Sequence, residues 1–188
     1  THLMRSTDGG ATWVSQSLGN QISMITDLYF SSPDTGFVFG GTDANIQLAN
    51  AVILRTVDAG KTWTKVYQST RPFEIIWKAH FPTSSTGYAT LLSYAPNTLE
   101  RFIAKTTDGG ITWNDVPLVS NGAKAFSVGF LTENTGWVGC DQSIYETNDG
   151  GRSWTPENVG QYVNKIRVLS DTAYGIGVRI YKMTPAKP

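Results

Sequence analysis

The chain has 188 residues, 40% of them hydrophobic, which is enough to form one folded domain with a core. Its 15 basic and 15 acidic residues give a formal net charge of zero, so no overall charge would draw it to nucleic acid or to an anionic membrane. The single cysteine, Cys140, excludes an internal disulfide and a cysteine-based zinc site, and no apolar run approaches the ~20 residues of a membrane-spanning helix.

The first predicted elements are two short strands, at 2–5 and 13–17, joined by a glycine-rich turn. A longer unit follows, with an apolar strand at 22–30, a polar turn leading into an aromatic-led strand, a loop at 41–50, a strand at 51–54 and a second glycine-rich turn. This succession of strand A, turn, strand B, loop, strand C, turn and strand D begins again at 73 and 125, and starts once more at 163. No segment has a sustained helical period, so the sequence predicts an all-β fold.

The turn between strands C and D repeats one motif at 6–13, 56–63, 106–113 and 147–154, with spacings of 50, 50 and 41 residues. Such spacings are typical of a β-propeller built from four-stranded antiparallel blades. In each copy a glycine supplies a positive φ, an aspartate accepts hydrogen bonds within the turn, and a tryptophan leads the next strand. We expect a structural role for these positions, which are Asp8, Gly10, Thr12, Trp13, Asp58, Gly60, Thr62, Trp63, Asp108, Gly110, Thr112, Trp113, Asp149, Gly151, Ser153 and Trp154.

The pattern Ser/Thr-x-Asp-x-Gly-x-Thr/Ser-Trp resembles the BNR/Asp-box repeat, and the resemblance covers nearly the whole chain. Such repeats occur in sialidases, xyloglucan-degrading glycoside hydrolases, sortilin-type receptors and photosystem II assembly factors. The Thr-Gly-aromatic strand midway, together with Arg5, Arg55 and Lys105 just before the turns, is most similar to the Ycf48/HCF136-like (photosystem II assembly factor-like) family. This resemblance implies a β-propeller that acts as an assembly or binding factor, and it favours an extracytoplasmic location, periplasmic or secreted.

Counting strands gives about four blades. We expect a partial blade at 1–20 that holds strands C and D, blades at 21–70, 71–120 and 121–160, and a partial blade at 161–188. Two arrangements fit this count. Either the N-terminal C and D strands complete the C-terminal A and B strands and close a four-bladed ring, or the chain is a partial propeller whose open sheet edges self-associate. The abrupt start of the chain favours the partial propeller.

The sequence predicts no catalytic residue, no cofactor and no metal. The resemblance to sialidases would imply an arginine triad, but most of the few arginines fall beside the Asp-box turns. A glycosidase needs two carboxylates roughly 5–10 Å apart. The carboxylates expected near the inner strands are Asp27, Asp43, Glu74 and Asp141, and none has a sequence context beyond that of a solvated loop or strand end. The two histidines, His2 and His80, are isolated in the sequence, and Cys140 is expected to be buried and inert.

The loops that join strand B to C and strand D to A should share one end of the blades. The longest of them are 41–50 and 93–100, and function is commonly carried on such loops. Candidate binding residues on this face are Asp43, Asn45, Arg71, Tyr94, Lys124, Asp141, Tyr162 and Lys165. We therefore expect a non-catalytic binding or assembly module whose partner is another protein. The alternative is a carbohydrate-binding or carbohydrate-active propeller, such as a fragment of a sialidase-like or xyloglucanase-like glycoside hydrolase.

Overall fold

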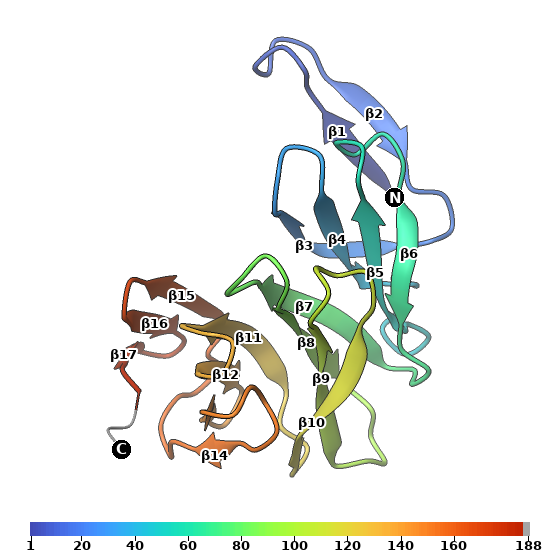
Figure 1. Ribbon diagram of the computed structural model, residues 1–188. Coiled ribbons are helices and arrows are strands. Elements are labelled where there is room, and N and C mark those ends of the chain that lie inside the picture. Colours follow the sequence, from blue (N-terminus) through green and yellow to red (C-terminus); the bar gives the residue numbers. More distant parts are fainter. Residues whose placement is uncertain (186–188) are drawn as a thin grey trace.

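The computed structural model of the protein describes residues 1–185, and the secondary structure in that range consists of β-strands. The strands form five antiparallel sheets that follow one another along an arc (Figure 1). In chain order they are β1 (His2–Arg5), β2 (Val14–Ser17), β3 (Met24–Phe30), β4 (Gly36–Gly41), β5 (Ala51–Thr56), β6 (Thr64–Gln68), β7 (Glu74–His80), β8 (Gly87–Ser93), β9 (Glu100–Thr106), β10 (Asn114–Ser120), β11 (Ala125–Phe130), β12 (Gly136–Cys140), β13 (Ile144–Thr147), β14 (Thr155–Pro156), β15 (Lys165–Leu169), β16 (Thr172–Ile176) and β17 (Ile180–Met183).

Three of the sheets are complete four-stranded meanders, made of β3 to β6, β7 to β10 and β11 to β14. Strands β3, β7, β11 and β15, each the first of its sheet, lie on the concave side of the arc (Figure 1). Strand β7 contacts β3 and β4 of the preceding sheet and β11 of the following one. This is the blade arrangement of a β-propeller, so the predicted all-β class and four-stranded antiparallel blades are confirmed.

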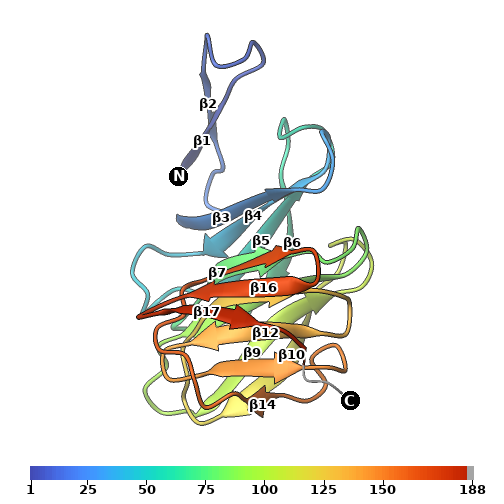
Figure 2. The same ribbon diagram turned by 90° about the vertical axis from the view of Figure 1, so that its left-hand side faces the viewer.

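The arc is open. Strands β1 and β2 pair with each other and project from one end, whereas the three-stranded sheet of β15, β16 and β17 forms the other end (Figure 1 and Figure 2). The closed four-bladed ring considered above is therefore not formed, and the described residues make a partial propeller.

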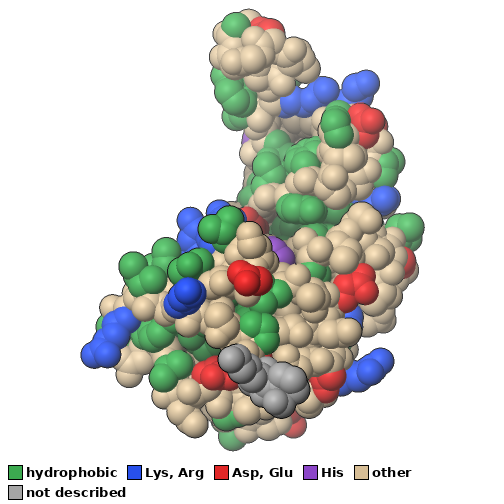
Figure 3. Space-filling view, turned by 60° about the vertical axis from the view of Figure 1, so that its left-hand side comes forward, with side chains coloured by type: hydrophobic (Ala, Val, Ile, Leu, Met, Phe, Trp, Pro, Cys, Tyr) green, Lys and Arg blue, Asp and Glu red, His purple; other side chains and the backbone are tan. Residues whose placement is uncertain are grey.

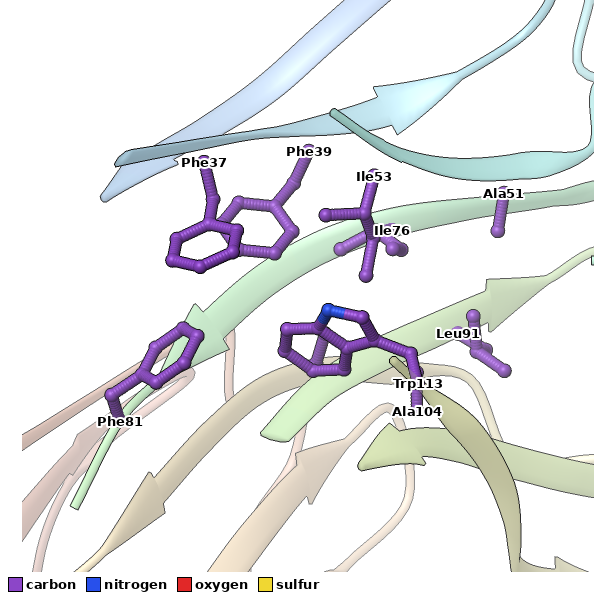
Figure 4. Close-up of a cluster of buried hydrophobic side chains, with 10 residues drawn as sticks. Phe37, Phe39, Ala51, Ile53, Ile76, Phe81, Leu91, Ala104 and Trp113 are labelled. Carbon is purple, nitrogen blue, oxygen red and sulfur yellow. The ribbon is translucent and has the colours of Figure 1, made fainter. Parts of the chain in front are cut away.

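Aromatic side chains join neighbouring sheets. Trp113, just before β10, lies edge-on to Phe37 and Phe39 of the preceding sheet, with ring centroids 6.4 and 6.2 Å away (Figure 4). It also lies edge-on to Phe81 of its own sheet at 5.7 Å. Burial of one such side chain stabilises the fold by about 1.5–3 kcal/mol, and edge-to-face contacts add to this. The tryptophan of the third turn thus holds two successive sheets together.

A glycine opens strand B of each complete sheet because a phenylalanine from strand A covers it. A Cβ atom on Gly136 would lie 2.3 Å from the ring of Phe130, and the same clash would occur in the other two complete sheets. In the last sheet the facing pair is Val168 and Ala173. Val168 has no ring and leaves room for the methyl group of Ala173. Both positions therefore differ from the phenylalanine and glycine of the complete sheets.

The four repeated turns between strands C and D, which we call Asp-box turns after the motif that they resemble, share one set of hydrogen bonds. In the third, Asp108 accepts bonds from the Thr112 hydroxyl at 2.6 Å and the Thr106 hydroxyl at 2.8 Å, and the Gly110 N–H donates to the Thr106 hydroxyl at 2.9 Å. Equivalent bonds occur in the other three turns. The φ of Gly110 is 78°, which is the left-handed conformation that glycine adopts most easily. The carboxylate therefore ties strand C to strand D.

Candidate functional site

The two ends of the blades carry different connections. At one end the Asp-box turns meet the A-to-B turns, as in the hydrogen bond from the Gly109 N–H to the Ser85 carbonyl oxygen at 2.8 Å. At the other end the B-to-C and D-to-A connections meet, as in the bond from the Tyr94 N–H to the Phe73 carbonyl oxygen at 2.9 Å. We call this second end the loop face, and it comprises 18–23, 42–50, 69–73, 94–99, 121–124, 141–143, 157–164 and 177–179.

Four of the eight predicted binding residues form a continuous row on the loop face, which we call the tyrosine row: Tyr94, Lys124, Asp141 and Tyr162. The Lys124 ammonium lies 5.2 Å from the centroid of the Tyr94 ring. The backbone N–H of Lys124 donates to Asp141 Oδ1 at 2.9 Å. The Tyr162 N–H in turn donates to the Asp141 carbonyl oxygen at 3.1 Å. Loops of successive sheets are thus joined into one surface.

Both aromatic ends of the tyrosine row are exposed to solvent, with Tyr94 at 42% and Tyr162 at 61%. Tyr162 has a φ of 50°, a conformation that non-glycine residues adopt rarely and that is often found at functional sites. Its ring lies 6.3 Å from that of Phe126. A hollow of about 340 Å³ is lined in part by Gln142, Tyr181 and Gln161, the residue before Tyr162. Exposed tyrosines are suited to contacts with a partner molecule.

Arg71 takes part in an ion-pair network. Its Nε lies 2.8 Å from Glu74 Oε1, its second guanidinium nitrogen lies 2.6 Å from Asp115 Oδ2, and the guanidinium covers the Phe102 ring at 4.4 Å. Glu74 is only 3% exposed, so the expectation of a solvated carboxylate is wrong for this residue. Burial raises the pKa of Glu74, and Arg71 opposes that increase. The network fastens the connection at 69–73 to β10.

Asp43 and Asn45 organise their own loop. The Asn45 N–H donates to Asp43 Oδ1 at 2.8 Å, and the Gln47 N–H donates to Asn45 Oδ1 at 3.1 Å. Side chains that accept hydrogen bonds from the backbone two residues further on are typical of tight polar turns. These two residues therefore shape the loop at 42–50, and nothing in their contacts joins them to the tyrosine row.

Lys165 does not belong to the tyrosine row, because it lines a hollow of about 180 Å³ among the innermost strands β3, β7, β11 and β15. We call this the concave hollow, and its charged and titratable lining consists of Asp27, Lys78, His80, Lys165 and Arg167. Histidine, acidic and basic side chains come together in the recess of the arc in Figure 3. From the sequence, Asp27 and His80 stood as single residues, and Lys78 and Arg167 were not predicted as site residues. Alignment of strands A on Phe30 and Phe81 would have placed Asp27 and Lys78 at one repeat position.

His80 has a defined protonation state in the concave hollow. Its Nδ1 accepts a hydrogen bond from the Phe130 N–H at 3.2 Å, so in the neutral ring Nε2 carries the hydrogen. Burial, and then the nearby positive charge of Arg167, lower the pKa of His80. The ring is therefore neutral at pH 7 and offers an N–H donor.

Cys140 is buried, as expected from its apolar surroundings, and burial raises the pKa of its thiol. Such a thiol is inert because the thiolate is the reactive species. Residues 1–185 include no helix long and apolar enough to cross a bilayer.

The sheets and their two unlike ends place the chain among the β-propellers. No protein-family model matches it, and no curated protein matches it. Solved structures do match. The structure of YCF48 bound to a D1 peptide is similar with a TM-score of 0.62 and 20% identity, over 90% of this chain and 54% of that one.

Two further structures have the same fold. YCF48 from Cyanidioschyzon merolae matches with a TM-score of 0.55 and 18% identity, over 91% of this chain and 56% of that one. The GH74 xyloglucanase from Xanthomonas campestris matches with a TM-score of 0.60 and 14% identity, over 90% of this chain and 28% of that one. The chain thus spans about half the length of the YCF48 structures and less of the xyloglucanase. At these identities the likeness concerns the fold, and it agrees with the propeller resemblance seen in the sequence.

Proposed function

We propose that the chain is a non-catalytic binding or assembly module that recognises a segment of a partner protein through its loop face. The observation that carries this proposal is the tyrosine row, in which two exposed aromatic rings flank a lysine and an aspartate. Exposed tyrosine supplies a large contact area with little conformational entropy to lose, and the charged pair between the rings would fix the orientation of a peptide. The similar YCF48 structure holds a D1 peptide, which supports a peptide ligand for this fold.

The contacts of the four candidate carboxylates support a non-catalytic role. Asp27 accepts a hydrogen bond from the Ala79 N–H at 3.0 Å and lies 3.6 Å from the Lys78 ammonium. Glu74 is paired with Arg71, and the remaining two accept backbone N–H bonds within the loops. A carboxylate held in this way contributes to structure, whereas a glycosidase needs two that face a substrate cleft.

Glu146 of β13 and Glu157, just after β14, are a further pair of acids that the sequence did not single out. Burial raises the pKa of Glu157, and a side-chain hydrogen bond with Glu146 raises it further. Glu146 also accepts a bond from the Asn148 side chain at 3.1 Å, which places it in a local network on β13.

Peptide display tests the proposal, with a glycan array as the parallel arm. The affinity of selected peptides would be measured for the native chain and for Tyr94→Ala and Tyr162→Ala. Ile111→Ala is the control, because Ile111 is exposed but lies in an Asp-box turn at the opposite end of the blades. We expect at least about a tenfold loss for each loop-face variant, typical of an aromatic hot spot, and little change for the control.

Two outcomes would count against a protein partner. Peptides that bind all three variants equally would place recognition elsewhere. Glycans bound in the absence of any peptide, with binding lost in Tyr94→Ala, would favour the carbohydrate alternative, for which the likeness to a xyloglucanase is the supporting observation. Turnover of a glycoside substrate would exclude the non-catalytic assignment.

We also propose that the open ends of the arc bind a second copy of the chain. At one end Leu28 is 53% exposed and Phe30 is 42% exposed, and both line a hollow of about 270 Å³ that they share with Leu3 of β1. At the other end Ile180 is 76% exposed. Exposed apolar sheet faces are a general cause of association between chains.

The contacts between neighbouring sheets within the chain indicate how the two ends would fit together. Phe130 is the last residue of strand A in one sheet and stacks on Tyr88 of the preceding sheet, with ring centroids 3.6 Å apart. Phe30 holds the same place as Phe130, since each faces the glycine that opens strand B. Tyr174 holds the place of Tyr88 on the last sheet, since Tyr88 follows Gly87 and faces His80 of strand A, and Tyr174 follows Ala173 and faces Arg167. Contact between Tyr174 of one copy and Phe30 of another would therefore repeat a junction that the chain already uses.

A further inference from the structure

The concave hollow has an excess of positive charge. Within the hollow, Lys78 and Asp27 form an ion pair, with the Lys78 Nζ 3.6 Å from Asp27 Oδ1. Lys165 and Arg167 also line the hollow, and neither forms an ion pair within residues 1–185. Two positive charges are thus left without a counter-charge at a concave surface, where the walls strengthen the local potential.

The hollow also presents hydrogen-bond donors of three kinds. Arg167 offers the planar fork that matches two oxygens of one oxyanion, and Lys165 offers a compact positive charge. His80 adds a neutral Nε2–H, because its Nδ1 is occupied by the Phe130 N–H. The Ser127 hydroxyl donates to the Val163 carbonyl oxygen at 2.6 Å, so it is committed to the fold. The lining therefore offers donors to an anion.

Local backbone features position part of this lining. The register between β7 and β8 shifts between Ile76 and Ala79, so Lys78 lies in a bulge. The Lys78 N–H donates to the Thr90 hydroxyl at 3.0 Å in place of a regular ladder bond. A second register shift, between Ile25 and Asp27 in β3, adjoins the acidic partner of Lys78. Bulges re-aim side chains and are frequent beside functional sites.

We propose that the concave hollow binds a doubly charged tetrahedral oxyanion, either free phosphate or the phosphate group of a phosphomonoester. The charge of such an anion balances Lys165 and Arg167, and its oxygens accept from Arg167, Lys165 and the His80 N–H. The hollow of about 180 Å³ is small and polar, which suits a compact anion better than an extended sugar chain. This site is separate from the tyrosine row, so it goes beyond recognition by the loop face.

Calorimetric titration at low ionic strength tests the proposal, with inorganic phosphate in one arm and N-acetyl-phosphoserine amide in the other. Saturable binding of one anion per chain is expected for at least one of the two. Arg167→Gln and Lys165→Gln should each weaken binding by at least about tenfold, since each removes a charge-assisted contact. Lys182→Gln is the matched control, because Lys182 lies two strands across from Arg167 in the same sheet and does not line the hollow.

Nitrogen chemical shifts of His80 provide a second readout that loss of folding would not mimic. Addition of phosphate should shift its Nε2 resonance in the native chain and in Lys182→Gln, but not in Arg167→Gln. Sulfate should compete, whereas chloride at equal ionic strength should not. Absence of saturable binding in both arms overturns the proposal. Equal weakening by Lys182→Gln and Arg167→Gln also overturns it, since binding would then reflect general charge.

Discussion

Each Asp-box aspartate is a hydrogen-bond acceptor that the fold requires in its ionised form. Hydrogen bonds from the side chain and then the backbone of Thr112 hold the pKa of Asp108 at about 2, against 3.8 ordinarily. Bonds from Thr12 hold the pKa of Asp8 at about 2 in the same way. Because the folded chain has the lower pKa, protonation favours the unfolded chain. The contribution of these groups is present above pH 4 and is lost as the pH falls towards 2.

Replacement of Asp108 by asparagine should reduce the acid sensitivity of the fold. The amide can still accept hydrogen bonds but has no proton to bind, so one titrating group is removed between pH 4 and 2. Thermal melting followed by circular dichroism across this range would show a shallower fall of Tm with acidity for Asp108→Asn. Asp34→Asn is the control, since Asp34 is an exposed turn residue and should leave the slope unchanged. Identical slopes for native chain and Asp108→Asn would show that the box carboxylate does not couple folding to pH.

At the residue scale, sequence reasoning succeeds where contacts are local and fails where they are distant. Asp108 and its partners lie within six residues of one another, so their spacing predicts the turn. The partner of Arg71 on β10, Asp115, is 44 residues away along the chain. No local pattern indicates that pair, and for the same reason Glu74 resembles an ordinary strand-end carboxylate in the sequence.

At the scale of elements, the Asp-box turn also packs against the preceding sheet. A Cβ atom on Gly110 would lie 2.3 Å from the Phe37 ring of that sheet. Gly109, its neighbour in the same turn, has a similar φ of 71°, and a Cβ there would lie 3.3 Å from the Ser84 carbonyl oxygen. The two glycines therefore share the backbone requirement but differ in the contact between sheets.

Alanine at these two positions separates the conformational cost from the packing cost. Gly109→Ala should destabilise the fold by about 1 kcal/mol, the usual cost of a left-handed alanine. Gly110→Ala should cost about 1–3 kcal/mol more, because it also forces the Phe37 ring out of the aromatic cluster. Urea denaturation of both variants measures the difference. Equal losses would mean that the turn moves freely relative to the preceding sheet.

Strand order and the recurring unit could be predicted because the repeats present the same pattern three times. The contact between the phenylalanine of strand A and the glycine of strand B could be predicted only in part. The glycine of the Thr-Gly-aromatic motif is visible in the sequence, but the ring that covers it is identified by the register, in which Phe130 faces Gly136. The bulge that contains Lys78 and the one that precedes Asp27 leave no clear signal in the sequence, because one extra residue in a strand changes only the local twist.

At the scale of the whole molecule, counting strands left ring closure undecided. The N-terminal pair and the C-terminal sheet together hold enough strands for one more blade, so the pattern alone allows closure. The structure separates them, because β17 already occupies the edge of β16 that β1 would need. The two ends of the arc therefore both expose apolar side chains, Leu28 and Phe30 at one end and Ile180 at the other.

Self-association of the native chain should therefore depend on both ends of the arc. Sedimentation over about a hundredfold range of protein concentration should show mass rising with concentration, as expected for contacts of modest affinity. Leu28→Lys should shift the chain to the monomer, because it places a charge on the face that Phe30 shares. Leu48→Lys is the matched control, since Leu48 is 63% exposed but lies on the loop face.

The opposite end offers an independent variant and a stricter test. Ile180→Lys should also yield monomers, while Ile111→Lys, at an exposed Asp-box position, should not. An association of end to opposite end has one further property: a mixture of Leu28→Lys and Ile180→Lys retains one intact face on each variant, so the two should form a heterodimer and extend no further. A native chain that stays monomeric at the highest concentration would contradict this mode of assembly, and so would a mixture that never forms the heterodimer. Nonspecific clustering of apolar surfaces would give particles of many sizes, whereas the proposed contact gives heterodimers of one size.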